Sequence, residues 1–258
     1  MGKIIAVANQ KGGVGKTTTA VNLSACLAIA EKKTLLIDID PQANASSGVG
    51  YMTEDGEKTI YQALIEQEKI HGLLCPTPIK WLDLIPSNIE LIGAEIELIS
   101  VSGREFRLKG ALQKIQDKYE YLIIDCPPSL GLLTINALSA ADSVIIPLQC
   151  EYYALEGVTK LLNTIKLIKQ NLNHELQVEG VLLTMFDKRT NLSKQVVKEV
   201  CEYFKEKVFA SIVPRNVSLS EAPSHGLPIV LYEIRSSGAQ VYLKLAKEVI
   251  DHVEKGIR

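Results

Sequence analysis

The chain has 258 residues, of which 47% are hydrophobic and 22% are charged, and its formal net charge is −2. This composition is ordinary for a soluble globular protein with one large core, and the total charge does not require a nucleic-acid partner. No apolar segment approaches the ~20 residues of a membrane-spanning helix, and no N-terminal stretch resembles a signal peptide. The five cysteines contain no C-x-x-C pair, which favours reduced thiols in a cytoplasm over disulfides or a zinc site.

The charges are distributed unevenly along the chain. Residues 185–258 hold 12 Lys and Arg against 9 Asp and Glu, whereas residues 1–184 hold 16 against 21. Any basic face should therefore come from the C-terminal part, although uneven surface charge alone would give the same counts.

In chain order, the first predicted elements surround a glycine-rich segment. The apolar run Ile4–Ala8 predicts a strand, the segment Asn9–Thr18 follows it, and a helical pattern extends from about Thr17 to Ala30. Strand, glycine-rich loop and helix in this order are the context of a phosphate-binding loop. Two solvated lysines in a glycine-rich turn are the alternative, and the agreement of strand, glycines and lysine speaks against it.

Five residues of this segment carry the chemistry of phosphate binding. Gly12, Gly13 and Gly15 let the backbone approach a phosphate chain and aim successive N–H groups at it. The helix that begins there adds the positive end of its dipole. Lys16 can reach the β- and γ-phosphates, and the Thr17 hydroxyl can hold Mg²⁺.

A second lysine distinguishes this loop from the ordinary motif. Gln10 stands where the motif has glycine, and Lys11 follows it. One nucleotide bound within the same subunit does not need this extra charge beside Lys16. The arrangement is understandable if Lys11 reaches phosphates that a second subunit holds.

Aspartates follow two further apolar runs. Asp38 and Asp40 come directly after the run Leu35–Ile37, and Asp125 ends the run that begins at Tyr121. Because ligands bind outside the carboxyl ends of strands in open α/β sheets, we expect these carboxylates beside the phosphate loop. There they would orient Mg²⁺ or its water shell. A strand-end aspartate that caps the next helix is the alternative for Asp125.

Strands and helices alternate along the rest of the chain. We therefore predict an α/β fold with a mostly parallel, twisted sheet that has helices on both faces, as one domain over residues 1–258. The further strands are predicted at 81–85, 143–148, 179–184 and 208–213, and the further helices at 61–67, 88–99, 104–118, about 158–169, 191–207 and 239–254.

The segment from Lys11 to Thr18, with Asp38-Ile-Asp40-Pro-Gln and Asp125-Cys-Pro-Pro-Ser, resembles the deviant Walker-A ATPases of the P-loop class. The later stretches 149–157, 182–191 and 213–226 resemble the ParA/Soj branch, the bacterial chromosome and plasmid partition ATPases. The resemblance runs across nearly the whole chain and implies the same P-loop fold.

The resemblance also implies the residues that bind Mg·ATP. Asp38 and Asp125 match carboxylates around the metal, and Thr17 also binds Mg²⁺. Pro214 and Asn216 match the loop beside the adenine. The residues that match the triphosphate site are Gly12, Gly13, Gly15, Lys16, Thr17 and Thr18.

Three further roles follow from the same resemblance. Lys11 matches the signature lysine that reaches across an ATP-sandwich dimer, and Asp40 matches the residue that positions or activates the attacking water. Arg189 matches a basic residue that binds DNA in Soj-like proteins. The chain departs from the family pattern at Ala43, where glycine is common, and at Ser218, where close relatives often carry arginine.

The implied function is an ATPase whose ATP-bound homodimer binds DNA without sequence preference. A ParB-like, DNA-bound partner would stimulate slow hydrolysis and so release the dimer, which drives chromosome or plasmid segregation. The resemblance implies a cytoplasmic protein that is associated with the nucleoid when ATP is bound, without stable membrane association.

A membrane-switched relative of the MinD type is the first alternative. That role needs a basic amphipathic helix at the C-terminus. The predicted helix 239–254 has an apolar stripe, but part of its polar face is acidic, which suits packing on the domain better than binding to anionic lipid. The stripe consists of Val241, Leu245, Val249 and Val253, and the acidic residues are Glu248, Asp251 and Glu254.

A redox or metal-cluster member of the same superfamily, such as a nitrogenase iron protein, is the second alternative. Such a protein needs a pair of bridging cysteines. Cys126 and Cys150 lie in loops of different character, and visible absorbance of the purified protein would decide the question.

Overall fold

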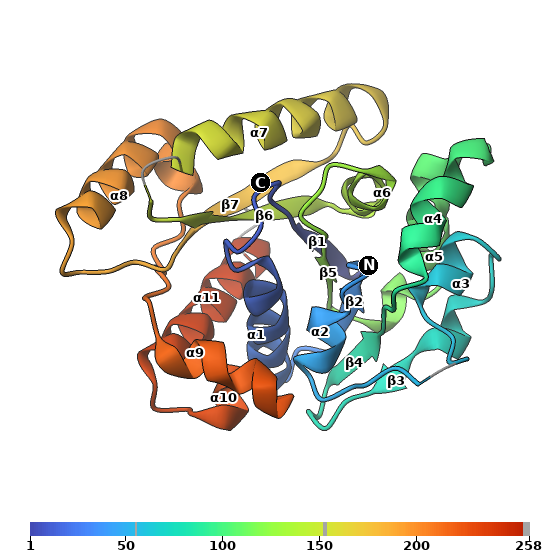
Figure 1. Ribbon diagram of the computed structural model, residues 1–258, viewed down its shortest axis with the longest axis horizontal. Coiled ribbons are helices and arrows are strands. Elements are labelled where there is room, and N and C mark those ends of the chain that lie inside the picture. Colours follow the sequence, from blue (N-terminus) through green and yellow to red (C-terminus); the bar gives the residue numbers. More distant parts are fainter. Residues whose placement is uncertain (55, 152–153, 255–258) are drawn as a thin grey trace.

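The computed structural model describes residues 1–54, 56–151 and 154–254, and within them the chain forms one sheet between two layers of helices (Figure 1). The strand order is β3-β4-β2-β5-β1-β6-β7, and among these pairs only β3 and β4 are antiparallel. This confirms the predicted fold class. The strands are β1 (Lys3–Val7), β2 (Thr34–Asp38), β3 (Cys75–Pro76), β4 (Leu82–Ile85), β5 (Tyr121–Asp125), β6 (Ser143–Gln149) and β7 (Gln177–Thr184).

The helices cover both faces of the sheet. The α-helices are α1 (Lys16–Ile29), α2 (Asn44–Ser47), α3 (Ile60–Leu64), α4 (Leu91–Glu97), α5 (Arg107–Leu112), α6 (Leu132–Ala140), α7 (Ala154–Asn171), α8 (Asn191–Phe204), α9 (Val217–Glu221), α10 (Ile229–Tyr232) and α11 (Ser237–Glu254). Short 3₁₀ turns are η1 (Ile70–Leu73), η2 (Leu98–Ser100), η3 (Arg104–Phe106), η4 (Gln116–Lys118), η5 (Lys205–Lys207) and η6 (Ala222–His225).

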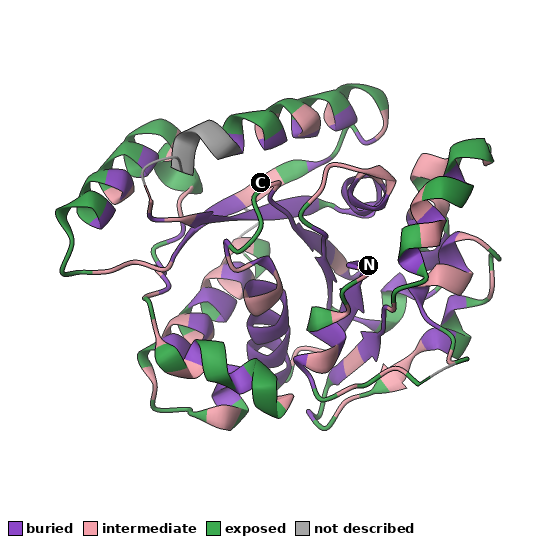
Figure 2. Ribbon diagram, in the orientation of Figure 1, coloured by how far each residue is buried: buried purple, intermediate pink, exposed green. Residues whose placement is uncertain are grey.

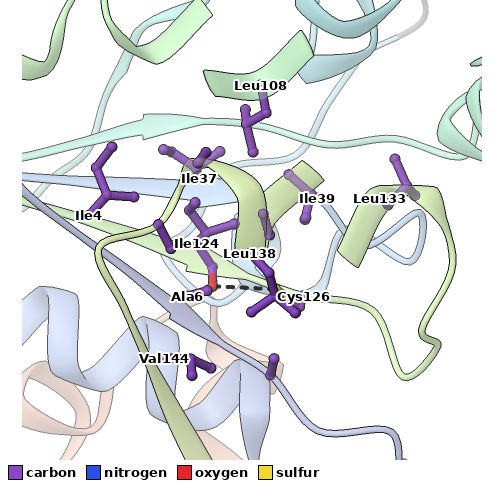
Figure 3. Close-up of a cluster of buried hydrophobic side chains, with 14 of the residues drawn as sticks. Ile4, Ala6, Ile37, Ile39, Leu108, Ile124, Cys126, Leu133, Leu138 and Val144 are labelled. Atoms are coloured by element: carbon purple, nitrogen blue, oxygen red, sulfur yellow. Dashed lines mark hydrogen bonds between the residues drawn. The ribbon is translucent and has the colours of Figure 1, made fainter. Parts of the chain in front are cut away.

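Two hydrophobic clusters hold these layers together. Because successive strand residues point to opposite faces, Ile4 and Ala6 of β1 belong to the cluster that α5, α6 and α7 cover, shown in Figure 3. Ile5 and Val7 belong to the cluster on the other face, where α1 and α11 pack. The central strands are buried on both sides, as Figure 2 shows in purple. This explains why they appear in the sequence as unbroken apolar runs.

The register of the central strands gathers the acidic strand ends. Asp125 at the end of β5 is paired with Val7 of β1 on one side and with Asp38 of β2 on the other. The chain leaves β1 directly into the glycine-rich segment. The sheet therefore brings the two carboxylates to the same edge as the loop, as expected.

Two predicted elements differ from the structure. The segment 208–213 forms no strand, and Val208 alone in it forms an isolated bridge, to Val181. Ala210 N and Ser211 N instead donate hydrogen bonds of 2.9 Å to the carboxylate of Glu248 on α11. The predicted helix 104–118 is divided into η3, α5 and η4. Leu108 N donates to the side chain of Asn136 instead of to a helical carbonyl.

The C-terminal helix α11 packs on the domain against α1. Leu245 and Val249 of its apolar stripe are fully buried, and Val253 at its end is 39% exposed. Among the described residues, no helix combines the length and the apolar character that crossing a membrane would need. Tyr152 and Tyr153, in the predicted loop after β6, lie outside the described residues.

Candidate nucleotide-binding site

The loop between β1 and α1 is fixed by contacts at both of its ends. Gly13 and Gly15 have φ angles of 72° and 88°, in the left-handed region that glycine adopts without strain. The Asn9 side chain donates to Pro147 O at 2.7 Å and accepts from Lys11 N at 3.1 Å. From β7, Thr184 Oγ1 donates to Val14 O at 2.9 Å. The sequence indicated the glycines but not the contact from Thr184, which is distant along the chain.

Lys16 is enclosed by the loop in which it lies. Its side chain is nearly buried, and its ammonium group donates to Lys11 O at 3.1 Å. Burial lowers the pKa of Lys16, and the negative charges of Asp125 and Asp40 oppose this shift. The chain thus holds a positive charge within a glycine-rich loop at the N-terminus of a helix, which is an arrangement that binds phosphate. Lys16 is the first residue of α1, and Thr17 and Thr18 follow it in the first turn.

Asp125 is a buried carboxylate without a hydrogen-bond partner among the described residues. Burial raises its pKa well above the usual range and the neighbouring Asp38 adds to the shift, whereas Thr17 and Lys16 oppose it. An unpartnered buried carboxylate costs free energy unless a cation compensates it. Oxygen ligands of this kind suit Mg²⁺, so Asp125 and Thr17 fit a site for that ion.

Asp38 is placed differently, although the same prediction grouped it with Asp125. Its carboxylate accepts hydrogen bonds from Ser46 N and Ser46 Oγ, both at 2.8 Å, and from Asp40 N at 3.1 Å. Burial raises the pKa of Asp38 to about 6, against the effect of these hydrogen bonds. Asp38 therefore anchors α2 and orients the segment that carries Asp40.

Asp40 is nearly buried at the end of this segment. Its Oδ1 accepts from Gln42 N at 3.0 Å, and its main-chain oxygen accepts from Ser87 Oγ at 2.5 Å. Ser87 N in turn donates to Ser46 Oγ. Sequence reasoning missed Ser46 and Ser87, since neither belongs to a motif with a fixed spacing to the loop.

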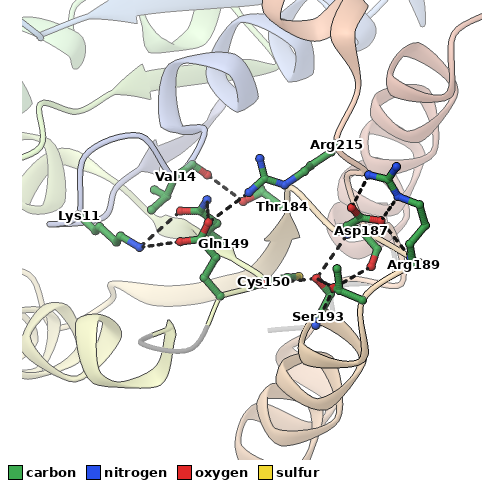
Figure 4. Close-up of polar contacts among 11 residues, drawn as sticks. Lys11, Val14, Gln149, Cys150, Thr184, Asp187, Arg189, Ser193 and Arg215 are labelled. Atoms are coloured by element: carbon green, nitrogen blue, oxygen red, sulfur yellow. Dashed lines mark hydrogen bonds and ion pairs between the residues drawn. The ribbon is translucent and has the colours of Figure 1, made fainter.

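Lys11 lies at the rim of the site and is exposed. Its ammonium group is 3.4 Å from Gln149 Oε1 and 3.5 Å from a carboxylate oxygen of Glu151 (Figure 4). Arg215 contacts the other oxygen of Glu151 at 3.2 Å. Glu151 thus links the phosphate loop to the segment that carries Pro214 and Asn216, and sequence reasoning gave it no role.

That segment lies beside the end of β7. Pro214 is bridged to Phe186, and Arg215 N donates to Phe186 O at 3.0 Å. Asn216 caps α9 through Leu219 N, and its amide donates to Ser237 Oγ. Because β7 also contacts the loop through Thr184, the structure brings the predicted adenine-side residues to the same edge of the sheet.

Arg189 lies apart from the phosphate loop, between β7 and α8. Its guanidinium group forms a bidentate pair with Asp187, at 2.9 and 2.7 Å, and its side chain is 82% exposed. These hydrogen bonds hold the pKa of Asp187 well below its usual range. The guanidinium group is thus held by Asp187 and would have to leave this carboxylate to bind another anion.

The two positions that depart from the family pattern also have defined places. Ala43 has a φ of 53°, in the left-handed region, and it precedes α2. Ser218 lies in α9 and is partly buried, next to Val217 at 72% exposure.

The fold and the phosphate loop together define a P-loop ATPase of the deviant Walker-A class. Residues 2–178 match the family described as AAA domain. The chain is 60% identical over 96% of its length to the sporulation initiation inhibitor protein Soj of Bacillus subtilis, covering 98% of that protein. It is 58% identical over 97% of its length to the chromosome partitioning protein ParA of Myxococcus xanthus, covering 88% of it. The chain belongs to the ParA/Soj family of partition ATPases, which confirms the resemblance.

A solved structure shares this fold. Cobyrinic acid a,c-diamide synthase from Mycobacterium smegmatis, with bound ADP and magnesium, has a TM-score of 0.88 and 37% identity, and the match covers 99% of this chain and 97% of that one. The same fold thus carries nucleotide and metal in a protein with another named activity.

Proposed function

We propose that this chain is a Mg-dependent ATPase that partitions a chromosome or plasmid by binding DNA as an ATP-bound dimer. One observation carries the proposal: the two lysines of one loop are placed differently, with Lys16 enclosed and Lys11 exposed at the rim. One lysine serves the phosphates of its own subunit, and the other is available to a second subunit.

ATP would bind with its phosphates on the loop and with Mg²⁺ between Thr17 and Asp125. The backbone N–H groups after Gly12 and the positive end of α1 support an anion there. Asp40, held by Ser87 and Gln42, would position the water that attacks the γ-phosphate. Hydrolysis would convert ATP to ADP and phosphate.

Dimer formation would turn ATP binding into DNA binding. Lys11 would leave Gln149 and Glu151 and contact phosphates in the partner, so that the dimer exists while ATP is intact. Two copies of the basic C-terminal part, each with Arg189, would then face DNA together. Hydrolysis would be slow alone, and a ParB-like, DNA-bound partner would stimulate it by supplying positive charge near the γ-phosphate.

The experiment is a DNA co-sedimentation assay with ATP, with ADP and without nucleotide. We expect binding with ATP and Mg²⁺, independent of DNA sequence, and at least about tenfold weaker binding in the other two conditions. Lys16→Ala serves as the control, since it should lose ATP binding and the ATP-dependent part of DNA binding. Equal DNA affinity with ADP and ATP would contradict the proposal and favour testing anionic liposomes.

A further inference from the structure

Helix α4 and the turn η2 that continues it carry two apolar faces. The inner face is fully buried in the core, and the outer face consists of isoleucines that are 53–68% exposed: Leu91, Ala94 and Leu98 lie inside, and Ile89, Ile92, Ile96 and Ile99 lie outside. Figure 2 shows much of α4 in green, the colour of exposed residues. Ile92 and Ile96 belong to α4, Ile89 lies in the turn before the helix and Ile99 lies in η2. Together these four residues form what we call the isoleucine face of α4.

Packing explains the inner face but not the isoleucine face. A helix at a protein surface normally presents polar residues to water and one apolar stripe to the core. Single exposed apolar residues need no explanation, whereas contiguous ones rimmed by polar groups mark interaction sites. The spacing of Ile89, Ile92, Ile96 and Ile99 places all four on one side of the helix.

Acidic residues outnumber basic ones in the segment that carries this face, and Arg104 donates a hydrogen bond to Ile99 O at its end. Residues 54–106 hold 10 Asp and Glu against 4 Lys and Arg. On the helix, Glu90 and Glu97 lie along one edge of the isoleucine face and Glu95 along the other, as the 3.6-residue repeat requires. A second copy of the chain meeting the face symmetrically would bring Glu90 and Glu97 against their own copies, and an anionic lipid surface would be repelled in the same way.

We propose that the isoleucine face of α4 is a docking surface for a basic amphipathic helix of a partner protein. Large apolar side chains of that helix would cover the isoleucines, and its Lys or Arg residues would meet Glu90 and Glu97, which are exposed. This is the helix-in-groove mode of recognition, in which apolar anchors recur at helical spacing, with charge complementarity selecting the partner.

The docking surface is connected to the nucleotide site through one loop. The Glu95 side chain lies so close to Gly131 that a Cβ there would be 2.1 Å from Glu95 Oε1. Gly131 precedes α6 in the loop that follows Asp125, and Pro128 of that loop is the near neighbour of Gly12. A partner bound to α4 would therefore act on the loop beside Asp125, and this consequence rests on the proposed ATPase function.

The test uses the full chain and a synthetic helical peptide of about 18 residues, with leucine on one face and lysine on the other. Fluorescence anisotropy should show saturable binding of this peptide. The double variant Ile92→Ser/Ile96→Ser should weaken binding at least about tenfold, since apolar anchors dominate such contacts. Leu167→Ser on α7, another exposed apolar position, is the matched control and should bind like the wild type.

Three results would overturn the docking surface. They are equal binding by the double variant and the wild type, equal binding of a peptide with glutamate in place of lysine, and concentration-dependent self-association that the double variant abolishes. The last result would assign the face to a second copy. Because the binding assay contains no nucleotide, a chain that hydrolyses no ATP but still binds the peptide would refute the proposed function and leave the docking surface intact.

Discussion

Ala43 is a single residue in a conformation that side chains rarely adopt. Its φ is 53°, and this left-handed conformation costs a residue with a Cβ about 1–2 kcal/mol. Ala43 ends a turn in which its N–H donates a hydrogen bond to Asp40 O. The strained residue thus lies three positions after the residue proposed to position water. The sequence marked this position only as a departure, since the angle depends on the fold.

We predict that Ala43→Gly stabilises the protein. Glycine removes the strain of the left-handed conformation, and this gain exceeds the extra conformational entropy that glycine loses on folding. The free energy of unfolding should therefore rise by about 0.5–1 kcal/mol. Urea denaturation measures the change. Ala30→Gly is the matched control, because Ala30 has a φ of −77° and its replacement should destabilise the protein by a few tenths of a kcal/mol or more. Lower stability for Ala43→Gly would show that the strain is not relieved.

We predict that alanine variants of Lys11 and Lys16 lose different functions. Lys16→Ala should lose Mg·ATP binding, because no other charge is enclosed by the loop in the same way. Lys11→Ala should keep nucleotide affinity within about tenfold and lose ATP-dependent dimers. Isothermal titration and sizing chromatography with ATP measure the two effects. Asp40→Ala is the companion variant, which should bind ATP, dimerise and stall, and a monomeric Asp40→Ala protein would contradict its assignment.

Among the predicted strands, helices and loops, those that the structure confirms depend on residues that are contiguous in the sequence. The phosphate loop was predictable because strand, glycines and lysine are contiguous, and the buried strands because both of their faces are apolar. Residues 208–213 were wrongly predicted as a strand, since Glu248 of a distant helix accepts the N–H groups of Ala210 and Ser211. Ser46 and Glu151 escaped notice for the same reason, because their partners at the site are brought to them by the fold.

Glu179 of β7 connects elements from both ends of the chain. Its carboxylate is 2.6 Å from the ammonium group of Lys3 on β1 and 3.5 Å from Nδ1 of His252 on α11. Burial alone would raise the pKa of Glu179, but the hydrogen bonds from Lys3 and Ser143, together with the charges of Lys3 and His252, outweigh burial and lower it. A carboxylate with a lowered pKa in the folded state stabilises the protein above the pKa of the unfolded state, and this contribution is lost as the pH falls.

We therefore predict that Glu179→Gln destabilises the protein by about 1.5–3 kcal/mol at neutral pH. The difference from the wild type should diminish as the pH falls below the value for free glutamate, about 4.3. Urea denaturation at a series of pH values measures it. Glu254→Gln removes an exposed partner of Lys32 and should change stability by less than about 0.5 kcal/mol. If the difference in the free energy of unfolding between wild type and Glu179→Gln is constant with pH, the charge of Glu179 does not contribute to stability.

At the scale of the whole molecule, the two alternative functions make different demands on the surface. A membrane-switched protein needs a free amphipathic C-terminal helix, but Leu245 and Val249 are buried in the domain. A cluster shared between subunits needs accessible cysteines, and Cys126 and Cys150 are both buried. Burial raises the pKa of the Cys150 thiol to about 11, which further disfavours the thiolate that a metal would bind.

The uneven distribution of charge leads to the last prediction. Each phosphate that a protein neutralises releases counterions, so the logarithm of DNA affinity falls with the logarithm of salt concentration, with a slope of about −0.9 per contact. If Arg189 contacts one phosphate in each subunit of an ATP-bound dimer, Arg189→Ala should reduce the magnitude of this slope by about 2. Lys69 is an exposed lysine in the segment 54–106, where acidic residues predominate. Lys69→Ala should leave the slope unchanged.

The pairing of Arg189 with Asp187 provides a second test, in which a substitution should strengthen DNA binding instead of weakening it. Asp187 holds the guanidinium group of Arg189. If Arg189 contacts DNA, Asp187 would compete with the phosphate for that group, and Asp187→Asn should strengthen DNA binding by the ATP-bound form. The gain should disappear in the double variant with Arg189→Ala, because the competition no longer exists. Filter binding at several salt concentrations, with ATP and a hydrolysis-deficient Asp40→Ala background, measures all of these slopes. If Asp187→Asn strengthens binding equally with and without Arg189, the aspartate acts only through its general charge and Arg189 is not the DNA contact.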